Sequence, residues 1–349
     1  MNYEPAADNL IYIILEFSTK KPDQEKPLLS VMNPAQEPPT PPKNRSANSR
    51  PAGLEYCGFV GLIGRPNVGK STLLNRLIGQ DLSITASKPQ TTRNRLLGIR
   101  TEGNFQMLFI DTPGIHDSDK LLNQKMVEYA VKTLDETDLN LWIVEPVAEN
   151  CSALHRYDRK ILELPGFRSG NTLVVINKID LTERGRILQT IDLFNQYGPF
   201  AEIIPISALR KVNLDQLLEL IEKYLPEHPF YFGTDQLTDV SERFLVAELV
   251  REQIFRKLYK ELPYSTAVQV EHFHQQPQCL NISCRISVER ETQKGILIGK
   301  DGTMLKKIGA AARKKIEGLL GQHVFLALHV KVVKQWTRKI HHLRTMGYQ

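Results

Sequence analysis

Short apolar runs alternate with helical patterns of apolar and polar residues between about residues 55 and 225. The runs that predict strands are Phe59–Ile63, Leu96–Arg100, Phe105–Ile110, Leu139–Val144, Leu173–Ile176 and Ile203–Ile206. Most are continuously apolar, as expected of parallel strands buried on both faces. The turn Thr101–Asn104 predicts a hairpin with one antiparallel edge strand. We therefore predict a doubly wound α/β domain over residues 55–225, with a mostly parallel sheet and a ligand at the C-terminal ends of its strands.

A second, α+β domain is predicted over residues 241–349, after a linker at residues 226–240. Helical spacing predicts a first helix over Ser241–Leu262 and a basic helix over about Thr303–Leu319. The predicted strands are Val268–Val270, Ile282–Val288 and Val324–Val333. A glycine-rich segment, Gly295–Gly302, directly precedes the basic helix.

The first 54 residues differ from the rest of the chain. The apolar run Leu10–Leu15 is too short to cross a bilayer, and acidic rather than basic residues precede it, so it is a poor signal peptide. Pro34–Pro51 is rich in proline, asparagine and serine. We predict a mostly disordered extension, with Met32 as an alternative start of the chain.

Charge is unevenly distributed along the 349 residues. Residues 285–349 carry 14 lysine and arginine residues against four acids, although the whole chain has a formal net charge of only +6. Such an excess suggests that the C-terminal end meets a polyanion, with solvated helix faces as the alternative. The four cysteines include no pair of C-x-x-C motifs, which argues against a zinc site and indicates a reduced, cytoplasmic setting.

Residues 64–71 fit the pattern G-x-x-x-x-G-K-[ST] and lie between a predicted strand and a helical pattern. Gly64 and Gly69 let successive N–H groups converge on phosphate oxygens, Lys70 adds positive charge and the Ser71 hydroxyl can ligate Mg²⁺. The nucleotide-binding residues predicted here are Gly64, Arg65, Pro66, Asn67, Val68, Gly69, Lys70, Ser71 and Thr72. The loop alone fits ATP and GTP equally, and a turn that binds nothing is the alternative.

Asp111, Thr112, Pro113 and Gly114 follow the predicted strand Phe105–Ile110. An acid at this place can reach the metal through a water molecule, and the Gly114 N–H can meet the γ-phosphate. A simple turn is the alternative for an isolated string. Its position one core strand after the phosphate-binding motif favours the metal-side acid and a nucleotide switch.

Asn177, Lys178 and Asp180 follow the predicted strand Leu173–Ile176. The Asp180 carboxylate can accept hydrogen bonds from the N1–H and the 2-amino group of guanine, whereas adenine offers no matching pair of donors. Asn177 is expected to brace the loop, and the stem of Lys178 to pack on the base. Ser207 and Ala208, at the end of another predicted strand, offer a backbone N–H to the guanine carbonyl.

A threonine hydroxyl in the segment Gln90–Arg93 could complete the Mg²⁺ shell when a γ-phosphate is present. Thr92 is favoured because a Thr-Arg pair occupies this place in related GTPases, and Thr91 is the alternative. The predicted metal ligands are therefore Ser71, Thr92 and, through water, Asp111.

The motifs, in this order, resemble the Era family of the translation-factor-related GTPases. The strings that carry the resemblance are Pro89–Arg93, Asp111–His116, Arg243–Phe244, Glu261–Ser265, Ile298–Gly302, Leu305–Gly309 and Ala312–Arg313. The resemblance runs from about Tyr56 to Tyr348 and implies a P-loop GTPase domain followed by a type II KH domain. The first 54 residues and the segment His272–Leu280 have no counterpart in the family pattern.

The resemblance also implies a mechanism. Ile115 stands where Ras-like enzymes have the glutamine that orients the attacking water, so intrinsic hydrolysis should be slow. Asn67 is the position at which related GTPases coordinate K⁺ in place of an arginine finger. His116 is a candidate general base, with a structural role as the favoured alternative. The residues expected to act in hydrolysis are Lys70, Thr92, Gly114 and Asn67.

The Gly-x-x-Gly string Gly299–Gly302 lets a backbone approach single-stranded RNA closely, in a groove for about four nucleotides. The RNA-binding residues predicted are Ile298, Gly299, Lys300, Asp301, Gly302, Lys306, Lys307 and Arg313. The two residues after Arg313, Lys314 and Lys315, either flank the groove or face water.

The family implies that the RNA is the 3′ end of 16S rRNA, bound during assembly of the 30S subunit, and that GTP or GDP controls access to it. A cytoplasmic monomer is expected. The alternatives are an RNA-binding protein with a vestigial G domain, and a regulatory GTPase of the cell cycle that contacts the inner membrane peripherally.

Overall fold

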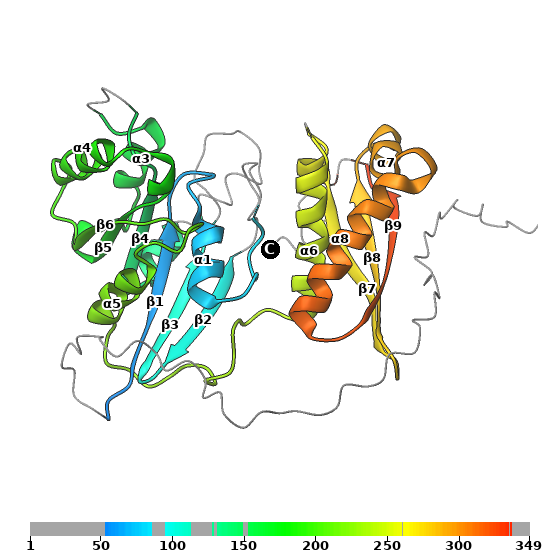
Figure 1. Ribbon diagram of the computed structural model, residues 1–349, viewed down its shortest axis with the longest axis horizontal. Helices are drawn as coiled ribbons and strands as arrows, with labels where there is room; N and C mark the ends of the chain where they lie inside the picture. The colour runs from blue at the N-terminus through cyan, green and yellow to red at the C-terminus, as the bar shows by residue number, and fades with distance from the viewer. Residues whose placement is uncertain are drawn as a thin grey trace, which may run out of the picture.

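The computed structural model describes residues 53–85, 95–112, 128, 131–148, 153–259, 261–334 and 336. They form two domains connected by a linker, with the first domain on the left of Figure 1 and the second on the right. Most of the predicted extension at residues 1–54 lies outside the described residues. Within these ranges, every helix is too short or too polar to cross a membrane.

The first domain is built on a six-stranded sheet. Its strands are β1 (Tyr56–Ile63), β2 (Leu96–Glu102), β3 (Phe105–Asp111), β4 (Leu139–Val144), β5 (Thr172–Ile176) and β6 (Glu202–Pro205). Their order across the sheet is β2-β3-β1-β4-β5-β6. Only the β2/β3 pair is antiparallel, and the other four pairs are parallel. This confirms the predicted doubly wound fold with one antiparallel edge strand.

Helices cover the two faces of this sheet. They are α1 (Lys70–Ile78), α3 (Arg156–Leu162), α4 (Arg184–Asn195) and α5 (Leu214–Tyr224), with short 3₁₀ turns at Ser169–Asn171 and Ile179–Leu181. Along β4, Leu141 packs in the same cluster as residues of α1 and α5, whereas the next residue, Trp142, packs with Phe194 of α4. Because successive side chains point to opposite faces and both faces are buried, the strand sequence is apolar throughout.

The second domain places helices on one face of a three-stranded sheet. Its elements are α6 (Glu242–Lys257), β7 (Ala267–Gln275), β8 (Leu280–Val288), α7 (Glu291–Ile298), α8 (Thr303–Leu320) and β9 (Val324–Val332), with 3₁₀ turns at Pro263–Ser265 and Lys300–Gly302. The order is β7-β8-β9, with β7 antiparallel and β9 parallel to β8. Alternate residues of β8 pack against α6 and α8, which run side by side in Figure 1.

Several element boundaries in this domain differ from the predicted ones. The first helix ends at Lys257 instead of Leu262, because Leu258 has an extended backbone. Strand β7 extends beyond Val270 to Gln275, where exposed histidine and glutamine residues hide the strand pattern. Residues Gly295–Ile298, the first half of the glycine-rich segment, form the last turn of α7.

The linker runs along the edge of the first domain. The side chain of Gln106 in β3 is fully buried, and its Oε1 accepts hydrogen bonds from the backbone N–H groups of Tyr231 (3.0 Å) and Phe232 (3.1 Å). Farther along, the N–H of Ile99 in β2 donates to the carbonyl of Leu237 at 2.8 Å. The linker therefore lies against the sheet edge instead of spanning free solvent.

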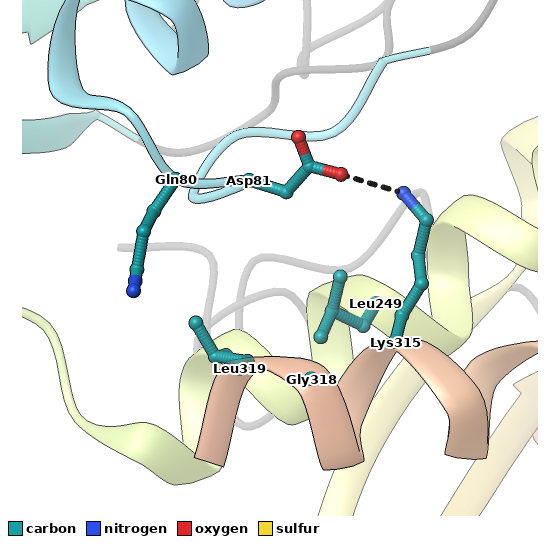
Figure 2. A pocket seen from close by; sticks show the side chains of 6 residues that line it. All are labelled: Gln80, Asp81, Leu249, Lys315, Gly318 and Leu319. Atoms are coloured by element: carbon teal, nitrogen blue, oxygen red, sulfur yellow. Dashed lines mark hydrogen bonds and ion pairs between the residues drawn. The ribbon is translucent and has the colours of Figure 1, made fainter. Parts of the chain in front are cut away.

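The two domains meet at a small ionic cluster next to α1. Lys315 Nζ of α8 lies 3.1 Å from Asp81 Oδ2 in the first domain (Figure 2). The same Nζ lies 2.8 Å from Glu252 Oε2 of α6. Thr85 Oγ1 donates to Glu252 Oε1 at 3.3 Å. A cavity of about 250 Å³ beside this cluster is lined by Gln80, Asp81, Leu249, Lys315, Gly318 and Leu319. Lys315, predicted to flank an RNA groove or to face water, thus lies at the domain interface.

Candidate nucleotide-binding site and RNA-binding loop

The phosphate loop, residues 64–71, connects the end of β1 to the start of α1. Its backbone takes two conformations that favour special residues: Gly69 has φ 104° and Asn67 has φ 65°. A Cβ at Gly69 would lie only 2.3 Å from Asn177 Nδ2, so a larger residue cannot be accommodated without moving Asn177. The conformation of the phosphate loop therefore depends on the neighbouring loop that carries Asn177 as well as on its own sequence.

Lys70 lies inside the curve of this loop. Its Nζ donates to the carbonyl oxygens of Gly64 (2.9 Å) and Arg65 (2.8 Å), and the residue is only 7% exposed. Burial lowers the pKa of the Lys70 ammonium to about 8, and the carboxylate of Asp111 opposes that shift. A phosphate at this position would stabilise the charged form, because an opposite charge nearby raises the pKa of an ammonium group.

The metal side of the site is formed by the start of α1 and the end of β3. Ser71 Oγ donates to Asp111 Oδ2 at 2.9 Å, and Asp111 is fully buried. The neighbouring Thr112 Oγ1 donates to the carbonyl of Leu62 in β1 at 2.6 Å, which fixes the chain after the aspartate. The structure thus brings together two of the three predicted metal ligands.

The other predicted residues of the switch segments cannot be placed. Thr91, Thr92, Pro113, Gly114, Ile115 and His116 lie outside the described residues. Their roles remain predictions from the sequence.

The base side of the site is a set of hydrogen bonds between three loops. Asn177 Nδ2 donates to the carbonyl of Val68 (2.8 Å), and Asn177 Oδ1 accepts from the N–H of Ala208 (3.0 Å). The exposed Asp180 accepts a hydrogen bond from Ser207 Oγ at 2.5 Å through its Oδ1. Asn177 therefore links the phosphate loop to the predicted base-binding residues, and Asp180 is accessible to a base.

Lys178 bridges the base side and the phosphate side. Its Nζ donates to the carbonyl of Asn67 at 2.6 Å and forms an ion pair with Glu145. Glu145 directly follows β4 and was not predicted as a site residue. Its position at the carboxyl end of a parallel strand was the signal available in the sequence.

Arg65 of the phosphate loop forms an ion pair with Asp158, a second acid that was not predicted as a site residue. Arg65 Nε lies 2.9 Å from Asp158 Oδ2 of α3, and Asp158 is 3% exposed. Burial raises the pKa of Asp158 to about 6, although the positive charge of Arg65 opposes the shift. No local motif distinguishes this aspartate from other helix-surface acids, so sequence reasoning had no signal for it.

The second glycine-rich loop, Gly299–Gly302, is called the GxxG loop here and connects α7 to α8. Gly299, Asp301 and Gly302 all have positive φ, at 73°, 53° and 72°. Lys300 and Asp301 are exposed, and Ile298, the residue before the loop, is half-buried. The two middle residues of the loop are thus accessible at the surface, whereas Gly302 is buried.

Three predicted RNA contacts lie on α8, downstream of the loop. Lys306 and Lys307 are exposed, and Arg313 is half-buried two turns farther along. Leu305, Ile308 and Ala312 alternate with them and pack in the core. Helical periodicity therefore gives α8 one apolar and one basic face.

The residues of the first site fit a nucleotide with Mg²⁺. Ser71 and Asp111 offer the oxygen ligands that Mg²⁺ prefers, and Lys70 is a buried cation beside them. Within the described residues, no group of three or more His, Cys, Asp and Glu side chains could hold a metal ion. Mg²⁺ bound here would therefore draw further ligands from the nucleotide and water.

Two family models match the chain. The model described as 50S ribosome-binding GTPase matches residues 59–178, and the KH domain model matches residues 261–337. The matched ranges fall within the two domains that carry the phosphate loop and the GxxG loop.

Curated relatives and solved structures cover both domains. GTPase Era of Geobacter metallireducens is 48% identical over 293 residues, which is 83% of this chain and 97% of that protein. GTPase Era of Pseudomonas putida is 44% identical and covers 84% of this chain and 96% of its own length.

Two solved Era structures are similar over 84% of this chain and 99% of theirs. Era in complex with MgGDPNP and nucleotides 1506–1542 of 16S ribosomal RNA has a TM-score of 0.79 at 40% identity. An Aquifex aeolicus Era variant bound to GDP and AlF4⁻ has a TM-score of 0.78 at 39% identity. The phosphate loop, the base-side loops and the GxxG loop thus occur in one chain whose relatives share both domains, and this chain belongs to the Era family of GTPases.

Proposed function

We propose that this GTPase binds the 3′ end of 16S rRNA through its KH domain and acts in the maturation of the 30S subunit. The observation that supports this most is the likeness over 84% of the chain to Era in complex with MgGDPNP and nucleotides 1506–1542 of 16S ribosomal RNA. The exposed GxxG loop and the basic face of α8 supply the chemistry, because a close backbone and cationic side chains suit single-stranded RNA.

GTP hydrolysis in this chain depends on positioning and charge. Lys70 binds the phosphates, and Ser71 and Asp111 are the residues that would hold Mg²⁺, which neutralises charge on the transferred phosphate. Asn177 and Lys178 fix the base-side loops to the phosphate loop. In the proposed reaction Thr92 and Gly114 order around the γ-phosphate, and Asn67 is the residue that would hold a K⁺ ion, which would supply charge stabilisation.

We also propose that the nucleotide state controls RNA access through the domain interface. Thr85, seven residues before Thr92, accepts a hydrogen bond from Arg256 Nη2 at 3.0 Å and donates to Glu252. Both partners belong to α6 of the KH domain. A change in the conformation of the Thr92 segment would therefore act directly on a KH-domain helix.

Anisotropy of a fluorescent RNA with the sequence of nucleotides 1506–1542 tests the RNA proposal. We expect tight binding with a GTP analogue and weaker binding with GDP, and weak binding of a shuffled RNA in both states. Equal affinity for the native and shuffled RNA would contradict the proposed partner. Equal affinity in the two nucleotide states would contradict only the proposed control.

The K⁺ proposal is tested by turnover at equal ionic strength. We expect faster GTP hydrolysis in KCl than in NaCl, and loss of that difference in Asn67→Ala. Equal turnover in both salts would exclude a K⁺ role.

The proposed place of action is the cytoplasm, with the protein as a monomer. Peripheral contact with the inner membrane is the alternative suggested by the basic C-terminal region. Flotation with anionic vesicles in the absence of RNA separates the two, because only membrane contact would carry the protein upward.

A further inference from the structure

Ser83 lies five residues after α1 ends and is held there by the side chain of Asn75. Asn75 Oδ1 accepts from the N–H groups of Leu82 (3.0 Å) and Ser83 (2.8 Å), and its Nδ2 donates to the carbonyl of Ser83 (2.8 Å). Asn75 is 5% exposed and Ser83 is 8% exposed. Three hydrogen bonds thus fix the backbone of Leu82 and Ser83 relative to the helix that begins with Lys70 and Ser71.

The Ser83 hydroxyl donates to the metal-side carboxylate. Ser83 Oγ lies 2.7 Å from Asp111 Oδ2, and Ser71 Oγ lies 2.9 Å from the same oxygen. A hydroxyl bonded to a buried carboxylate at this distance is a strong, charge-assisted hydrogen bond. Both hydroxyls therefore bond to the same carboxylate oxygen, Oδ2.

We propose that Ser83 is a positioning residue of the nucleotide site, whose hydroxyl orients the Asp111 carboxylate and so raises the affinity of the nucleotide complex for Mg²⁺. The proposal rests on Mg²⁺ binding between Ser71 and Asp111. Residues that orient a metal's ligands typically change metal affinity or activity by about 10- to 100-fold when removed. Ser83 also connects the metal side to the chain that leads into the Thr92 segment.

A purely structural role makes a different prediction. If the hydroxyl only tied the chain after α1 to the core, its loss would lower stability and leave the Mg²⁺ dependence of nucleotide binding unchanged. The two roles are therefore separated by a measurement of Mg²⁺ affinity that does not depend on turnover.

The experiment follows the release of a fluorescent GDP analogue from the full chain as a function of free Mg²⁺. In Ser83→Ala we expect the Mg²⁺ concentration for half-maximal slowing of release to rise about tenfold. With excess EDTA, the release rate should stay within about twofold of the unchanged protein, because the phosphate and base contacts remain. Ser83→Thr, which keeps the hydroxyl, should restore most of the Mg²⁺ affinity.

Thr137→Ala is the matched control, because this equally buried hydroxyl of the first domain contacts Asn140 instead of Asp111. Its Mg²⁺ dependence should equal that of the unchanged protein. An unchanged Mg²⁺ dependence in Ser83→Ala would overturn the proposal. Equal losses of Mg²⁺ affinity in Ser83→Ala and Ser83→Thr would also overturn it. The same holds if Ser83→Ala releases the GDP analogue faster in EDTA to the same degree as in Mg²⁺.

Discussion

The phosphate loop and the GxxG loop both follow a regular element, contain glycines at positive φ and lead into a helix, yet their surroundings differ. In the phosphate loop Lys70 is buried, whereas Lys300 in the GxxG loop is exposed. A Cβ at Gly69 would meet Asn177 from another loop, whereas a Cβ at Gly299 would meet Met304 of the helix that follows it, at 2.8 Å. The first loop is enclosed by distant parts of the chain and the second only by its own helix.

This difference explains how similar backbones serve different ligands. An enclosed loop can surround a small anion and supply several buried contacts that discriminate strongly. An open loop can accept a polymer that enters and leaves at both ends, and its contacts are screened by salt. Single changes should therefore have large effects at the first loop and small ones at the second.

The largest effect is expected for Lys70→Ala. Loss of a buried cation that faces phosphate should weaken GDP binding about a thousandfold, because breaking a buried charge pair costs about 4 kcal/mol. Calorimetric titration with GDP measures this. RNA affinity without nucleotide should not change, and a large loss of it would show that the loops are not independent.

The next effect is expected for Asp180→Asn. The amide can no longer accept both hydrogen bonds from guanine, so GDP affinity should fall by about 10²-fold. Xanthine carries a carbonyl in place of the 2-amino group, and the asparagine N–H₂ can donate to it. Competition between GDP and xanthosine diphosphate should therefore favour the xanthine nucleotide, and a retained preference for GDP would contradict the assigned role.

An effect of intermediate size on the pH dependence of stability is expected from Asp158, the acid behind the phosphate loop. The pKa of Asp158 in the folded protein, about 6, lies above the ordinary value of 3.8, so the folded state binds the proton more tightly than the unfolded chain. This contribution to stability is present below about pH 4 and is lost as pH rises through 6, and amounts to about 3 kcal/mol. The Asp158→Asn variant should therefore lack this pH-dependent contribution to stability.

The two tryptophans make the comparison between domains possible. Trp142 is buried in the first domain and Trp336 in the second. In a Trp336→Phe background, the fluorescence of Trp142 reports the unfolding of the first domain in denaturant. The free energy of unfolding measured in this way should show the pH-dependent difference between the protein with Asp158 and the Asp158→Asn variant. In a Trp142→Phe background, Trp336 reports the unfolding of the second domain. There Asp158→Asn should leave the free energy of unfolding unchanged at every pH if the two domains unfold as separate units.

The smallest effect is expected for Lys300→Ala in the GxxG loop. RNA affinity should fall about threefold to tenfold, and the slope of log affinity against log salt should decrease by about 0.7, the value for one contact with a single strand. Lys132→Ala, an exposed lysine of the first domain, is the control and should change neither. An unchanged salt slope in Lys300→Ala would remove this lysine from the RNA contacts.

The same contrast separates what the sequence predicted from what it did not. The strand, the loop and Lys70 were predictable because their signals lie within about a dozen consecutive residues. The mostly parallel sheet with one antiparallel edge strand followed from the buried apolar runs and the short hairpin between β2 and β3. The type of fold was therefore predictable in both domains.

The residues that enclose the phosphate loop were not predictable in this way. Asp158, Glu145 and Ser83 contact the site across long sequence separations, and each is an ordinary polar residue in its own segment. Lys315 has the same local pattern as its basic neighbours, and only the packing of the two domains turns it toward Asp81. Such roles depend on tertiary contacts and not on local motifs.

The docked linker has a consequence for the behaviour of the protein in solution. Strand β2 is an edge strand, and an open edge offers N–H and carbonyl groups to strands of other molecules. The linker occupies these groups, since Ile99 donates to Leu237 and Thr238 Oγ1 donates to the carbonyl of Leu97 at 2.7 Å. The segment that connects the domains therefore also protects the first domain from edge-to-edge aggregation.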